Sequence, residues 1–134
     1  MRLTDPKTLR VAIATLGVVP AVTGLASMAR GTALTPDAAS ADSEHRFYAA
    51  WWTALGPVLW SLAPQAERRT RELDAVAATL FAGGLARIAG SRHRGRPAAR
   101  YEVLAALELV LPAALVLWPR AVRRRVLVRD DDAA

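Results

Sequence analysis

The sequence predicts an integral membrane protein of the all-α class, an antiparallel four-helix bundle. Apolar residues make up 53% of the 134 residues and charged residues 22%, and the charges gather between the apolar segments. Two charge-free runs, Val11–Ala29 and Phe47–Ala66, are each about 20 residues long. At about 1.5 Å per helical residue, such a run crosses a hydrocarbon core of about 30 Å. A chain of this length forms a single domain.

Four apolar segments follow one another along the chain. The first carries Pro20, which membrane helices tolerate because neighbouring groups satisfy the freed backbone carbonyl. The second opens on a charged head and is rich in tryptophan, Arg87 interrupts the third, and Glu108 interrupts the fourth. The expected spans are 9–29, 46–63, 73–90 and 102–118, followed by a basic and then acidic tail, 119–134.

The connections are polar. Arg30–Ser43 has the composition of a solvated loop, and Asp42 or Ser43 is expected to cap the helix that follows. Gln65–Glu72 reads as a charged turn and Ser91–Arg100 as a basic loop.

Small residues recur at helical spacing in the first and third segments. Such stripes let a neighbouring backbone approach closely in a membrane, so they predict helix packing or a homo-oligomer. The two stripes are Gly17, Ala21, Gly24 and Met28, and Ala78, Ala82, Ala86 and Gly90.

Lysine and arginine are unevenly shared between the two sides of a four-span topology. The N-terminus, the turn at 65–72 and the tail together carry 11 of them, whereas the opposite side carries 6. The positive-inside rule therefore places both termini in the cytoplasm. The arginine- and alanine-rich composition suggests a GC-rich bacterial genome, and the expected location is the bacterial inner membrane. An alternative reading of the first segment, as a signal peptide cleaved near Ser27–Ala29, stays open.

Charged residues inside the expected spans define a candidate polar cluster. Arg87 and Glu108 fall at similar depth on adjoining helices, so an ion pair is expected, with the arginine stem lying over Gly83. Glu44 and Arg46, at the head of the second span, start on the same side and extend the cluster. Three interpretations of these charges stay open. Arg87 extends its side chain to the membrane interface, or it forms with Glu108 a pair that only holds the helices together, or the cluster is a binding site.

Other classes of function find little support in the sequence. The net charge of +6 would suit nucleic acid, but basic loops also orient membrane proteins, so no nucleic-acid partner is expected. The arginines of the tail are expected to touch anionic lipids. There is no cysteine, and His45 and His93 lack metal-site spacing, so neither a metal nor another cofactor is expected. No catalytic motif occurs, which argues against an enzyme.

Further residues recur in a characteristic order along the four segments. They are Gly17, Pro20, Gly24, Glu44, Arg46, Phe47, Tyr48, Trp52, Gly56, Phe81, Gly83, Gly84, Arg87, Gly95, Pro97, Glu108, Pro112 and Trp118. Their order and spacing resemble the bacterial membrane family catalogued as domain of unknown function 4345, over roughly residues 9–119. The resemblance implies a small four-helix membrane protein and no chemistry. DoxX-like membrane proteins, some with quinone or redox partners, are similar in architecture alone.

The expected function is therefore that of a small multi-pass membrane protein, acting as a non-enzymatic accessory or small-ligand-binding module. The alternative is a redox-accessory or small-molecule transport protein that binds a quinone-like or anionic ligand at the polar cluster. A soluble helical binding protein is a third and less favoured reading.

Overall fold

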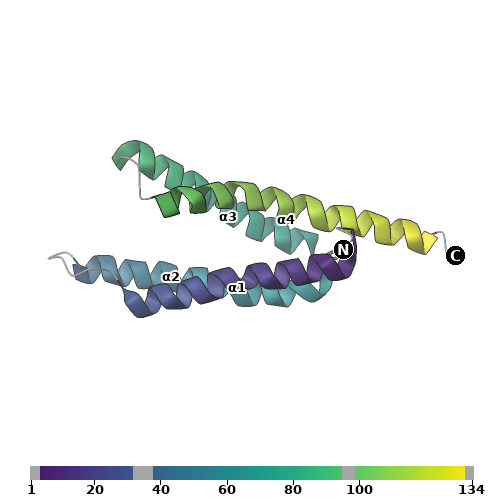
Figure 1. Cartoon of the computed structure of the whole chain (residues 1–134), viewed down its shortest axis with the longest axis horizontal. Helices are drawn as coiled ribbons and strands as arrows, with labels where there is room; N and C mark the ends of the chain where they lie inside the picture. The colour runs from purple at the N-terminus through teal and green to yellow at the C-terminus, as the bar shows by residue number, and fades with distance from the viewer. Residues whose placement is uncertain (1–3, 32–37, 95–98, 132–134) are drawn as a thin grey trace. The chain divides into compact units, whose positions relative to one another are not determined.

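The computed structural model describes residues 4–31, 38–94 and 99–131. Over these ranges the chain is helical and contains no strand, which confirms the predicted all-α class. The elements are α1 (Pro6–Arg30), α2 (Ala38–Leu62), the short 3-10 helix η1 (Ala63–Gln65), α3 (Thr70–Arg94) and α4 (Ala99–Asp131). Figure 1 labels α1 to α4.

The helices form two antiparallel hairpins, each in its own compact unit. Residues 10–64 make up one unit and contain α2 and most of α1, whereas α3 and α4 belong to the other. Within the first hairpin, Trp60 near the end of α2 bonds to Ala14 near the start of α1. Trp52, earlier in α2, bonds to Thr23, later in α1. The partners run in opposite directions, so the two helices are antiparallel.

Small residues set the distance between α1 and α2. A Cβ placed on Gly56 of α2 would lie 2.7 Å from the Cβ of Ala21 and 2.8 Å from the carbonyl oxygen of Gly17. A Cβ on Gly17 would lie 2.8 Å from the indole nitrogen of Trp60. The stripe of α1 therefore serves close packing as predicted, and its partner is α2 of the same chain. The stripe of α3 is exposed.

Several polar side chains of this hairpin donate hydrogen bonds to atoms within it. Hydroxyl groups bond to carbonyl oxygens three or four residues earlier in their own helix, and two indole N–H groups bond across to α1. A polar group needs such an internal partner when no water is available. The bonds are Thr23 to Val19 at 2.7 Å, Thr53 to Ala49 at 2.7 Å, Ser61 to Val58 at 2.7 Å, Trp52 to Thr23 at 2.8 Å and Trp60 to Ala14 at 2.9 Å.

The first turns of α2 replace part of the expected loop. The helix begins at Ala38, so Asp42 and Ser43 lie inside it and the predicted N-caps are wrong. The Asp42 carboxylate forms an ion pair at 2.6 Å with Arg46, four residues later. Pairs at this spacing stabilise a helix, which helps to explain why α2 starts earlier than its apolar run. The rest of that loop, residues 32–37, lies outside the described residues.

The end of α1 is closed by Gly31 and Arg46. Gly31 has a φ of 62°, the left-handed conformation that glycine adopts readily after a helix, and its N–H donates to the carbonyl of Ser27. The Nη1 atom of Arg46 donates at 2.6 Å to the carbonyl of Met28. The last turn of a helix leaves carbonyls unpaired, and Arg46 satisfies one of them.

The second hairpin is longer than expected at both ends. α3 begins at Thr70 and extends to Arg94, into the expected basic loop, of which residues 95–98 lie outside the described part. α4 continues through Pro112 and Pro119 to Asp131. The basic part of the expected tail is therefore the last portion of α4.

Three of the described helices are long and apolar enough to cross a membrane, as in an integral membrane protein. They are Pro6–Arg30, Thr70–Arg92 and Tyr101–Val128, with mean hydropathies of 1.9, 1.3 and 1.8. α2 is not among them, although it was predicted as a span. Three tryptophans and one tyrosine lower its hydropathy, yet these residues are enriched at membrane interfaces.

The close contact at Gly56 can be tested with one methyl group. The added methyl group of Gly56→Ala would push α2 away from Ala21 and Gly17 of α1. We therefore expect the free energy of unfolding to fall by about 1–3 kcal/mol. Gly90→Ala is the matched control, because nothing lies within 4 Å of its Cβ position. It should leave stability unchanged or raise it by up to about 1 kcal/mol through helix propensity. Thermal unfolding in detergent measures both, and equal effects would contradict the packing.

Candidate functional site

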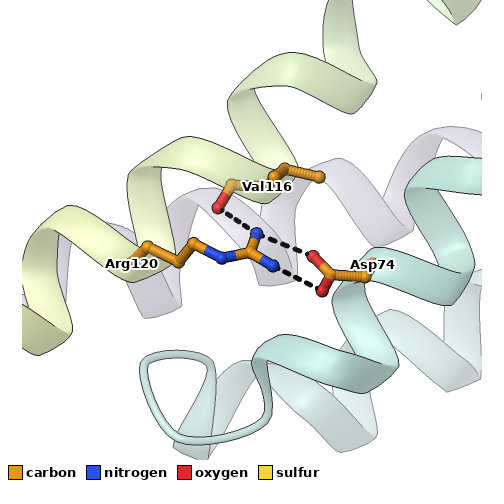
Figure 2. A network of polar contacts seen from close by, with 3 residues as sticks. All are labelled: Asp74, Val116 and Arg120. Carbon is orange, nitrogen blue, oxygen red and sulfur yellow. Dashed lines mark hydrogen bonds and ion pairs between the residues drawn. The ribbon is translucent and has the colours of Figure 1, made fainter.

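Two ion pairs join α3 to α4. The Nε atom of Arg87 lies 2.8 Å from the Oε2 atom of Glu108, which confirms the predicted pair. Nearer the other end of the hairpin, Asp74 receives two bonds from Arg120, one from Nη1 at 2.8 Å and one from Nη2 at 2.6 Å (Figure 2). Both pairs link residues that are far apart in sequence, so they fix the antiparallel register of the two helices.

The two members of the Arg87–Glu108 pair differ in burial. The side chain of Glu108 is 8% exposed, whereas that of Arg87 is 42% exposed. Glycines of α3 make room for the glutamate: a Cβ on Gly83 would lie 3.6 Å from its Oε2 atom, and a Cβ on Gly84 would lie 3.2 Å from its Cβ. The prediction that the arginine stem covers Gly83 is therefore wrong, because the carboxylate of Glu108 lies there instead.

Arg87 uses only part of its guanidinium group. Its bond to Glu108 is made through Nε, and among the described residues it makes no other hydrogen bond or ion pair. A guanidinium has five N–H donors in a planar fork, so the two terminal nitrogens keep their donors. They form an open, positively charged edge on the α3–α4 hairpin.

Arg120 shows the opposite arrangement. Both of its terminal nitrogens bond to the Asp74 carboxylate, and Nη1 also donates at 2.8 Å to the carbonyl of Val116 (Figure 2). A bidentate arginine–carboxylate pair of this kind is the strongest geometry available to these groups. The fork of Arg120 is directed into the hairpin, where it serves to join the helices.

Sequence reasoning missed the Asp74–Arg120 pair because Arg120 was assigned to the tail beyond Trp118. The register of the hairpin was the available signal. In antiparallel helices, a step back along one is matched by a step forward along the other. Asp74 lies 13 residues before Arg87, and Arg120 lies 12 residues after Glu108. The first expected pair therefore implied the second.

Flanking charges give the depth of each pair. Arg92 lies 20 residues after Glu72, and Arg123 lies 21 residues after Glu102. Each separation corresponds to about 30 Å of helix, the thickness of the hydrocarbon core. The only ionisable residues inside these limits are the four that pair: Asp74, Arg87, Glu108 and Arg120.

The two pairs lie at unequal depths between those limits. Asp74 and Arg120 are two and three residues inside, or about 3–5 Å. Arg87 and Glu108 are five and six residues inside the other limit, or about 8–9 Å. The Asp74–Arg120 pair thus lies near one end of the apolar stretch, whereas the Arg87–Glu108 pair lies deeper inside it.

The remaining two members of the predicted cluster belong to the first hairpin. Glu44 is exposed on α2, and Arg46 is engaged with Asp42 and with the carbonyl of Met28. Arg46 therefore closes the end of its own hairpin, and a cluster of all four residues stays a prediction. Among the residues that the structure describes, no group of three His, Cys, Asp or Glu side chains is placed to hold a metal ion.

Fold and site together define a small all-α membrane protein with ion pairs set within its apolar segments. The chain belongs to the family described as Domain of unknown function (DUF4345), whose profile matches residues 8–119. That range runs from the first turn of α1 to Pro119 in α4. No curated protein and no solved structure matches the chain, and the DoxX-like likeness stays a prediction.

A double-mutant cycle tests the Arg87–Glu108 pair. Arg87→Gln leaves a buried carboxylate without its cation, so we expect the free energy of unfolding to fall by about 1–3 kcal/mol. Glu108→Gln should cost less, about 0.5–1.5 kcal/mol, because glutamine still accepts a bond from the half-exposed arginine. The double variant should cost less than the sum, with a coupling of about 0.5–3 kcal/mol.

The measurement is unfolding in detergent, and the ordering of the two single variants is the informative result. Strict additivity would contradict the pair. A larger loss for Glu108→Gln than for Arg87→Gln would contradict the burial of the glutamate.

Proposed function

We propose that the protein is a non-enzymatic membrane accessory module that binds a small ligand at the Arg87–Glu108 pair. The carrying observation is the open edge of Arg87: a charged fork within the apolar stretch of α3, fixed by a buried carboxylate through one nitrogen only. An ionisable group at such depth is costly, by about 2.5–3.5 kcal/mol on insertion scales. Its unused donors favour a ligand that supplies acceptor oxygens.

The donor set limits the class of ligand. Two terminal nitrogens in one plane match the paired oxygens of a carboxylate or phosphate, and the cation is the feature that favours an anion over a neutral quinone-like carbonyl. Glu108 is close to Arg87 and negative, so a second carboxylate directly on top of it is disfavoured. The geometry therefore suits an anion that approaches the exposed side of Arg87, away from Glu108. A redox-accessory or transport role is the alternative, if the bound molecule is a quinone or is carried across.

Ligand binding is tested by mass spectrometry of small molecules that co-purify with the protein in mild detergent. We expect a bound acidic molecule in the unaltered protein and its loss in Arg87→Gln. Arg120→Gln is the matched control, because it removes an arginine whose terminal nitrogens are both already paired, and it should retain the ligand.

A conservative variant separates binding from folding. Arg87→Lys keeps the charge beside Glu108 but loses the planar fork, so it should stay folded and bind more weakly. Equal ligand content in all four proteins would refute the proposed site, and a co-purified quinone lost in Arg87→Gln would move the function to the alternative.

For the topology, we propose that α2 crosses the bilayer as a fourth span of a bacterial inner-membrane protein, with both termini in the cytoplasm. The flanking charges of α2, Arg46 and Glu67, are 21 residues apart, as close to the hydrocarbon thickness as those of α3 and α4. The indole N–H groups of Trp52 and Trp60 bond to α1, so neither requires water. Association of copies through the exposed stripe of α3 is a further part of the proposal.

Reporter fusions at the two ends decide the number of spans. With four crossings, a reporter after Ala134 and one before the first residue should both read cytoplasmic. With α2 outside the bilayer, three crossings would place the two reporters on opposite sides. An extracytoplasmic signal from both would keep four spans and reverse the orientation.

A further inference from the structure

We propose that three consecutive arginines near the end of α4 bind the headgroups of anionic phospholipids. Arg123, Arg124 and Arg125 are called the arginine collar below. This inference is independent of ligand binding at Arg87, because it concerns the other end of the α3–α4 hairpin.

The Asp74–Arg120 pair places the collar in the membrane. Arg120 is fixed to α3 by its bidentate bond (Figure 2), and α4 continues without interruption to Asp131. The collar begins three residues after Arg120, about 4.5 Å further along the axis. Arg123 also marks the limit of the apolar stretch of α4. The collar therefore starts where the hydrocarbon ends.

The collar places three positive charges side by side on the surface of α4. All three arginines are exposed, and within the described residues none of them makes an ion pair or a side-chain hydrogen bond. Arg46, Arg87 and Arg120, in contrast, are each held by a carboxylate of the chain. The three arginines of the collar lie together and outside the apolar stretch.

Helix geometry decides between a bilayer and a protein as the partner. Consecutive residues of a helix point about 100° apart, so the collar spreads over about 200° of the circumference of α4. A protein partner contacts one face of a helix, whereas a helix that passes through a layer of headgroups meets phosphates on most sides. The spread of the collar fits the second case.

The residues beyond the collar agree with this placement. The polar layer of each leaflet is about 5–7 Å thick. Val128, five residues beyond Arg123, lies about 7.5 Å further out and thus at its outer boundary. Asp130 and Asp131 lie about 11–12 Å beyond Arg123. The helix therefore continues beyond the polar layer.

The test uses the whole protein in bilayers and exploits the absence of cysteine. Ala121 is exposed next to the collar, and Ala121→Cys carries a fluorophore there. Quenching by spin-labelled phosphatidylglycerol, relative to spin-labelled phosphatidylcholine, gives the preference for anionic lipid. One arginine near an anionic surface raises the preference for anionic lipid by about fivefold. Three arginines therefore give an upper limit of about a hundredfold for this preference. At low salt we expect a preference above about tenfold, abolished near 1 M salt, where the Debye length is about 3 Å.

Three variants in this background separate the explanations. Changing the collar to glutamine (R123Q/R124Q/R125Q) should reduce the preference to near one. Changing it to lysine (R123K/R124K/R125K) should retain it, because the attraction is between charges. The charge-matched control R68Q/R69Q/R71Q, in the turn before and the first turn of α3, should leave most of the preference in place. An unchanged preference in the glutamine collar, or equal losses in the collar and the control, would overturn the proposal. Loss in the lysine collar would also overturn it.

Discussion

A bilayer core offers no water, so a polar group placed there must find its partner within the protein. That constraint accounts for the arrangement of both hairpins. In the first, hydroxyl and indole donors bond to acceptors of α1 and α2, among them the Thr23 hydroxyl and the carbonyl of Ala14. In the second, ionisable residues of α3 and α4 bond to one another. The open edge of Arg87 is the exception, and the proposed ligand site follows from it.

Close packing and polar contacts have separate roles in these hairpins. Lipid tails are as apolar as leucine, so helices in a membrane associate through tight packing and polar bonds rather than through the hydrophobic effect. Gly17 and Gly56 bring α1 and α2 together. In the second hairpin, Gly84 packs against Leu109, while the two ion pairs fix which residues lie opposite one another. A glycine sets a distance and an ion pair sets a register.

Much of this architecture was available in the sequence. Three of the four apolar segments expected from the sequence correspond to helices long and apolar enough to cross a membrane, and two charges of opposite sign inside adjoining segments predicted the Arg87–Glu108 pair. Ends of helices were less predictable, because Asp42 and Pro119 are typical of boundaries yet lie inside α2 and α4. The role of Arg46 was also out of reach: its bond to the Met28 carbonyl depends on how far α1 extends before it turns.

The spacing of the two ion pairs links this protein to the thickness of its membrane. Thirteen residues of α3 separate them, or about 20 Å, against a hydrocarbon core of about 30 Å whose thickness differs by a few Å between membranes. In a thinner bilayer the Arg87–Glu108 pair approaches the headgroups and gains water. In a thicker one it is drawn deeper, and the cost of its open nitrogens rises. A mismatch between the hairpin and its bilayer therefore changes the hydration of the Arg87–Glu108 pair, and hence its free-energy cost, as well as the tilt of the helices.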